Sequence, residues 1–225
     1  YVEDTLVETR LMMHHQDRDW AGYVYRWRSD GSDADWIQGG ASVSVGSKVW
    51  NIPSDSSCLQ CHTAASGRSL SAEVLQLNKA FVYSGSRRAN QLKTLSHIGI
   101  ISGMGSTEAA RRVSLDSSTL LEERVRSYLH VNCSNCHQPD GTGGGVMDFL
   151  FDADSMNVCG VSPNYGDLDI AGAQLVFPGE PAKSILLERI KRLDDKRMPP
   201  IATTVVDQGG VNLIQEWISS LNSCP

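Results

Sequence analysis

The chain contains two copies of one five-residue pattern, and this repetition constrains its fold more than any other feature. Residues 58–62 are CLQCH, and residues 133–137 are CSNCH. Each copy places two cysteines three positions apart and a histidine directly after the second cysteine. A disulfide, a zinc site, a redox dithiol and an anchor for a larger group are the interpretations to compare.

The spacing of the two copies separates these interpretations. Structural zinc is typically bound by closely spaced cysteine pairs, whereas residues 62–132 lie between the pairs here. A thioredoxin-like dithiol occurs once, near a βαβ unit, and no βαβ pattern surrounds either copy. Covalent haem attachment accounts for every position, because two thiols add to the vinyl groups of one porphyrin and the next histidine binds the iron.

The sequence therefore predicts two haem c groups as cofactors. In each motif the cysteines are expected to form thioethers and the histidine to be the proximal iron ligand. These residues are Cys58, Cys61 and His62 for the first haem, and Cys133, Cys136 and His137 for the second.

Composition and charge exclude several classes of protein. The 225 residues are 40% hydrophobic with a net charge of −6, which is typical of a soluble globular protein. The charge provides no basic footprint for nucleic acid, and no apolar run approaches the roughly 18 residues of a membrane span. Two cysteines remain outside the motifs, Cys159 and Cys224, and we expect them to form a disulfide in an oxidising compartment. Together with haem attachment, this predicts an exported, periplasmic or extracellular protein.

Beyond the two motifs, the chain resembles the c-type cytochromes. Its second half is similar to class I modules, with a helix, "NCSNCH", a long loop, an "RMPP" segment and a last amphipathic helix. The whole chain resembles a family of diheme bacterial cytochromes with a β-rich front end. The segments that carry this likeness are "ETRLMMHH", "WAGYVYRW", "CLQCHTAASGRSL", "NQLKTLSHIGI", "NCSNCH", "GDLDIAGAQLVFPGEPAKSILLERI" and "RMPP". The resemblance implies an electron carrier but names no partner.

The expected fold class is α+β, with a small antiparallel β N-terminal region followed by two mainly α-helical cytochrome c-like haem domains. Residues 1–50 alternate with a period of two and predict one sheet of three or four strands. Residues 51–105 are the first haem domain, with helices expected over 69–81 and 89–101. Residues 106–225 are the second, with helices before Cys133, over 181–193 and over 211–221.

Each iron requires a sixth ligand if it is to carry electrons without binding substrate. Met198 is the candidate for the second haem, because Pro199 and Pro200 stiffen the loop that holds it. Histidine and methionine ligation favours the ferrous state. The sequence leaves the first haem open between several residues and an open coordination site. The candidates are Met13, His15 and His97, followed by Met104, Met12 and His14.

These expectations predict an electron carrier rather than an enzyme, with redox proteins as donor and acceptor. One rival function is a diheme peroxidase-like enzyme, in which the first haem is open and binds a small ligand. Another is the cytochrome subunit of a larger dehydrogenase, or of an assembly of several copies. These rival functions differ from the first interpretation in iron coordination or in partner. The sequence determines neither of these two properties.

Overall fold

The front of the chain folds into two small antiparallel sheets. Strands β1 (Glu8–His14), β2 (Trp20–Trp27) and β3 (Ala34–Ile37) pair in that order, and β4 (Ala41–Val45) pairs with β5 (Lys48–Ile52). The sequence predicts a single sheet here. The structure instead has two sheets, and the chain turns between them at Gly39 and Gly40, which have φ values of 75° and 81°. The computed structural model describes residues 2, 4–17, 19–70, 74–103 and 120–224.

A small core of buried apolar side chains lies between these sheets. Val24 points away from solvent on β2 and is fully buried, while its neighbours along the strand are only partly covered. Because side chains alternate between the two faces of a strand, one face of β2 can be buried while the other remains accessible. The core is completed by Val2, Val7, Val45 and Ile52.

The segment after the front sheets is less helical than the sequence predicts. The 3₁₀ helix η1 (Asp55–Gln60) is followed by the short helix α1 (Val74–Leu77) and then by a hairpin of β6 (Ala80–Tyr83) and β7 (Arg87–Asn90). The expected helix over 69–81 is therefore wrong at its end, and Phe81 is 43% exposed instead of inward-facing. The β-branched and aromatic residues of "AFVY" favour a strand. Gly85, at φ 72° within the 3₁₀ turn η2 (Ser84–Ser86), lets the chain reverse.

Helix α2 (Gln91–His97) closes this segment and is shorter than the helix expected over 89–101. Asn90 caps it by accepting a hydrogen bond from the Lys93 backbone N–H. Leu92 is fully buried, as the helical spacing predicts, but Ile98 lies beyond the helix and is 58% exposed. Gly99, at φ 76°, ends the helical path.

The last part of the chain forms three helices around the larger core. Helix α3 (Leu121–Cys133) packs on α5 (Gln208–Ser220), and α4 (Ile185–Ile190) follows the 3₁₀ turn η3 (Pro181–Lys183). Helices were expected in all of these places. The helix over 181–193 is shorter than expected, and Leu193 is 47% exposed rather than inward-facing. The inward face of α5 includes Val211, Ile214, Trp217 and Ile218, all buried.

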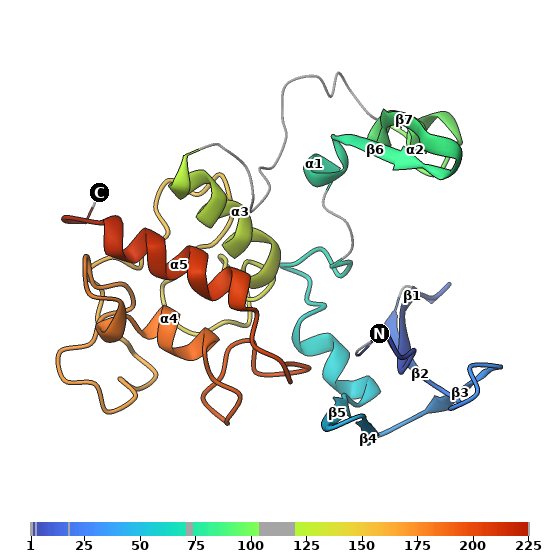
Figure 1. Ribbon diagram of the computed structural model, residues 1–225, viewed down its shortest axis with the longest axis horizontal. Coiled ribbons are helices and arrows are strands. Elements are labelled where there is room, and N and C mark those ends of the chain that lie inside the picture. The colour runs from blue at the N-terminus through green and yellow to red at the C-terminus, as the bar shows by residue number, and fades with distance from the viewer. Residues whose placement is uncertain (1, 3, 18, 71–73, 104–119, 225) are drawn as a thin grey trace.

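Figure 1 shows strands β1–β5 and helices α3–α5 at opposite ends, with residues 55–62 between them. The fold is thus mixed α+β. A disulfide joins Cys159 to Cys224 and ties the end of α5 to the loop region of the larger core. Among the described residues, no helix has the length and apolar character needed to cross a bilayer.

Candidate functional site

Both five-residue motifs adopt the same backbone turn. In the first, the N–H groups of Cys61 and His62 donate to the Cys58 carbonyl at 3.2 and 3.0 Å. In the second, the corresponding bonds run to the carbonyl of the leading cysteine, Cys133, at 3.1 and 2.9 Å. A helical turn places positions i, i+3 and i+4 on one face. Each motif therefore presents two thiols and an imidazole on the same side, although η1 begins in a loop and α3 is a long helix.

Burial raises the pKa values of three thiols in these motifs, those of Cys58, Cys61 and Cys133. The pKa of Cys133 is raised to about 12, first by burial and then by Cys136. Burial is also the main cause that raises the pKa of Cys61 to about 11 and raises that of Cys58. Reactive dithiols have lowered pKa values. The described residues contain no group of three or more His, Cys, Asp or Glu side chains that could hold a metal ion.

The ring of the first histidine is held through its Nδ1 atom. His62 Nδ1 lies 2.6 Å from the Arg68 carbonyl oxygen, which can only accept, so Nδ1 carries the proton. The Arg68 guanidinium donates in return to the His62 carbonyl at 3.1 Å. A second hydrogen bond of this kind fixes the ring and its tautomer in metal-binding histidines. The unprotonated Nε2 is therefore the nitrogen that His62 can offer to a metal.

The second histidine is held by packing. The Phe149 and His137 rings pack in a T-shaped arrangement with centroids 5.7 Å apart, and a Cβ at Gly143 would lie 2.6 Å from His137 Nδ1. Only glycine at position 143 allows the loop to approach the ring this closely. Burial lowers the pKa of His137, which favours the neutral imidazole that a metal requires. Its Nδ1 is buried without a hydrogen-bond partner in the described structure.

A cavity of about 580 Å³ opens beside the second motif. Both cysteines of the motif line it together with His137, and Met198 lines it as well. Cofactor pockets are typically about 300–1,000 Å³ and mostly apolar. Val146, Phe149 and Leu186 contribute to the apolar lining here. The structure therefore brings the proposed proximal and sixth ligands of the second haem to one cavity.

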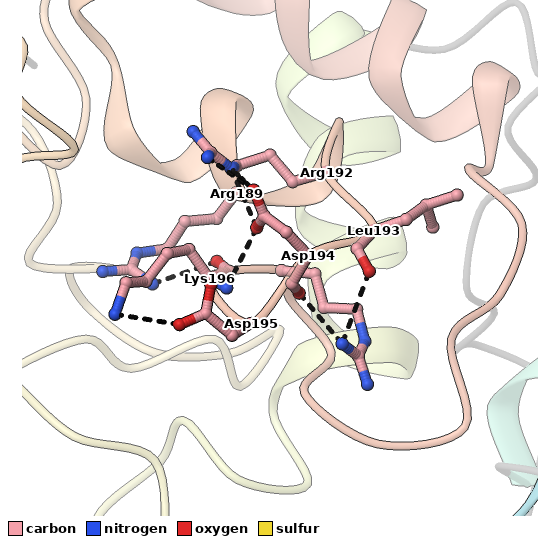
Figure 2. Close-up of polar contacts among 7 residues, drawn as sticks. Arg189, Arg192, Leu193, Asp194, Asp195 and Lys196 are labelled. Carbon is pink, nitrogen blue, oxygen red and sulfur yellow. Dashed lines mark hydrogen bonds and ion pairs between the residues drawn. The ribbon is translucent and has the colours of Figure 1, made fainter.

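The loop that carries Met198 is fastened to α4. The Met198 N–H donates to the Arg189 carbonyl at 3.0 Å, and the Arg189 guanidinium donates to the carbonyls of Lys196 at 3.0 Å and Tyr165 at 2.6 Å. Figure 2 shows Arg189 beside Lys196, with Asp194 at the centre of the preceding turn. The Asp194 carboxylate accepts from Arg192 at 2.9 Å and from the Lys196 N–H at 3.0 Å. Sequence reasoning missed Arg189, since a charged residue in the last turn of a helix is ordinary.

The candidates for the sixth ligand of the first haem lie on different faces of the front sheet. A Cβ at Gly22 would lie 2.4 Å from Cys58 Sγ, so this face of β2 packs on the first motif. Met12 is the cross-strand partner of Gly22, and directly paired residues project from the same face. Met13 and His15 project from the other face; Met13 is 47% exposed, and His15 Nε2 lies 2.9 Å from the Tyr23 hydroxyl.

The structure therefore does not bring Met13 or His15 to Cys58. His14 shares the face of Met12 but is exposed and stacks on Trp20, with ring centroids 4.9 Å apart. His97 lies at the exposed end of α2. Met104 lies outside the described residues.

A further histidine, His130, lies near the motifs and sequence reasoning passed over it. It lines a cavity of about 470 Å³ together with residues 65–67, 69 and 70. The Phe151 N–H donates to His130 Nδ1 at 3.2 Å, so in a neutral ring the proton sits on Nε2. His130 thus has the opposite tautomer to His62 and does not present an Nε2 lone pair in this geometry.

The comparisons with known proteins do not identify this site. No family model, curated protein or solved structure matches the chain. The chemistry of the site is consequently argued from its own side chains. Its main features are two motifs in one turn geometry, partly buried thiols, an oriented imidazole and a largely apolar cavity.

Proposed function

We propose that the chain is a diheme c-type cytochrome that carries single electrons. Cys58 and Cys61 would hold one haem, and Cys133 and Cys136 the other. The imidazoles that follow them would be the proximal iron ligands. When bound, haem supplies reversible one-electron chemistry at its iron. Residues 120–224 would then form a class I cytochrome c-like module.

One observation carries the proposal: the cavity at the second motif is lined by His137, by both thiols and by Met198. The residues present fit a haem. The cavity is largely apolar. A Cβ at position 143 would crowd the His137 ring, and glycine avoids this contact. A thioether sulfur is uncharged, so it suits the buried sites that keep these thiols neutral. Histidine and methionine on opposite sides of an iron raise its potential and leave no open site.

The chain's own residues orient the cofactors and exclude water. The Arg68 carbonyl fixes the proton of His62 on Nδ1, and Phe149 packs against His137 in a T-shaped arrangement. Arg189 holds the loop of Met198 through two carbonyl oxygens. Such positioning, together with burial, is how a protein tunes a redox cofactor.

We further propose an exported, periplasmic location with redox proteins as donor and acceptor. The disulfide between Cys159 and Cys224 supports an oxidising compartment. The net charge of −6 favours docking to partners with a basic surface.

The test is to measure bound haem in the chain exported from a bacterium that attaches c-type haem. We expect an intact mass two haem groups above that of the polypeptide. The double variant Cys133→Ser/Cys136→Ser should carry one haem, and the control Cys159→Ser, outside the motifs, should keep two. Colourless protein, or a mass equal to the bare chain, would refute the proposal. Low-temperature EPR then reports coordination, and a high-spin signal from the first haem would favour a diheme peroxidase-like enzyme instead.

A further inference from the structure

The two motifs touch each other, although residues 63–132 separate them along the chain. The Thr142 hydroxyl, in the glycine-rich loop after the second motif, donates to the Gln60 carbonyl at 2.9 Å. Gln60 is one of the two residues between the cysteines of the first motif. This hydrogen bond therefore joins the loop of one haem site to the backbone of the other.

The second cysteines of the two motifs also meet at this junction. The thiols of Cys61 and Cys136 are close enough to interact electrostatically, and each is the cysteine that directly precedes the histidine of its motif. Since both motifs have the same turn, these are equivalent attachment points on the two haems. Each thioether sulfur is separated from its porphyrin ring by a single carbon atom, so neighbouring sulfurs bring two ring edges together.

The contact between the two regions extends beyond the motifs. One wall of the cavity of about 470 Å³ comes from the chain that follows the first motif, including Ser66, Leu70 and Gln76. The other wall comes from the end of α3 and the second motif, including Val131 and Ser134. Both regions thus share a surface around the junction of Gln60 with Thr142.

We infer that Gln60, Cys61, Cys136 and Thr142 form an interface that holds the two haems edge to edge as an interacting pair. This inference rests on the proposed function and adds the way in which the two cofactors communicate. Exchange of one electron across the interface oxidises one ferrous centre and reduces one ferric centre, so no other reactant is consumed. At short range in a low dielectric, an electron on one centre disfavours a second electron on its neighbour.

The experiment uses circular dichroism of the Soret band of the purified holoprotein. Two haems in contact give a signal with two lobes of opposite sign. Isolated haems give the sum of two independent signals, measured on the variants Cys58→Ser/Cys61→Ser and Cys133→Ser/Cys136→Ser. Thr142→Val removes the hydroxyl of the interface. Thr94→Val is the matched control, because Thr94 donates to the Asn90 carbonyl at 3.0 Å within α2.

We expect the two-lobed signal in the wild type and in Thr94→Val, with its loss in Thr142→Val. In parallel, the gap between the two midpoint potentials should narrow in Thr142→Val. A wild-type spectrum equal to the sum of the single-haem variants, at a mass of two haems, would overturn the inference and leave the proposed function intact. A chain without haem overturns both. If Thr142→Val does not mature, the wild-type comparison with the sum still decides.

Discussion

The contact between α3 and α5 offers a sharp test of the packing beneath the second motif. A Cβ at Gly210 would lie 2.1 Å from the Tyr128 hydroxyl oxygen and 2.2 Å from Cζ of the same ring. In Gly210→Ala the ring must therefore retreat by roughly 1.3 Å to regain a contact distance of about 3.5 Å. At the neighbouring Gly209, a Cβ would meet Asp207 Oδ1 at 3.4 Å, which is an ordinary contact. The same substitution at adjacent positions of one helix thus has opposite steric consequences.

The magnitudes follow from this difference. Replacing a helical glycine by alanine stabilises a protein by about 0.5–1 kcal/mol, which is the expected result for Gly209→Ala. Gly210→Ala gains the same stabilisation of the helix, but overpacking costs it about 1–3 kcal/mol. It also disturbs the hydrogen bond of Tyr128 with the Asp207 carboxylate, a loss of roughly 1 kcal/mol. We expect Gly210→Ala to lower the free energy of unfolding by about 2 kcal/mol, leaving the two variants roughly 3 kcal/mol apart.

The assay is thermal and urea-induced unfolding followed by far-ultraviolet circular dichroism. For a chain of this size, roughly 3 kcal/mol corresponds to melting temperatures about 6–12 °C apart. A double-mutant cycle with Tyr128→Leu identifies the cause, because without the phenol ring Gly210→Ala should cost little. Equal melting temperatures of Gly209→Ala and Gly210→Ala would refute the reasoning. An undiminished cost of Gly210→Ala in the Tyr128→Leu background would refute it as well.

Three further predictions concern ligation, cross-linking and pH. Met198→Ala should abolish the methionine-to-iron charge-transfer band of one haem. Met147→Ala alters another methionine that lines the same cavity, and it should keep the band. An unchanged band in Met198→Ala would contradict the assignment. The Cys159–Cys224 disulfide closes a loop of 65 residues, so Cys159→Ser should lower the free energy of unfolding by about 4 kcal/mol in the chain-entropy model, and reductant in urea titrations should then have no further effect. Burial, followed by the Asp207 carboxylate, raises the pKa of Tyr128. Its phenol stays protonated in the folded chain where an unfolded tyrosine ionises, so stability should fall as pH rises above about 10, and less steeply in Tyr128→Phe.

The helices of the larger core could be predicted because their apolar residues repeat at helical spacing. Val211, Ile214, Trp217 and Ile218 all turn inward, as this period indicates. The hairpin of β6 and β7 was missed because a short apolar run such as Ala80–Tyr83 is compatible with either a helix or a strand. Local pattern does not decide between them when the partner strand lies several residues further along the chain.

The residues that complete the sites depend on long-range pairing, which the sequence does not contain locally. Alternation along β1 groups Met12 with His14 and Met13 with His15, but which group faces the first motif depends on how β2 packs against η1. A one-residue change of register would exchange the two groups. Thr142 and Gln60 carry no local signal at all, since a hydroxyl and a carbonyl become partners only when the whole chain has folded.

The thiols and imidazoles of the motifs have properties that support the proposed haem attachment. Reactive dithiols have lowered pKa values, whereas burial here raises the pKa values of Cys58, Cys61 and Cys133. A thioether has no charge, so the surroundings that penalise a thiolate accept it without cost. The tautomer of His62, fixed by the Arg68 carbonyl, leaves Nε2 able to bind an iron. Neutral sulfurs beside an oriented imidazole are compatible with the covalently held haem that we propose.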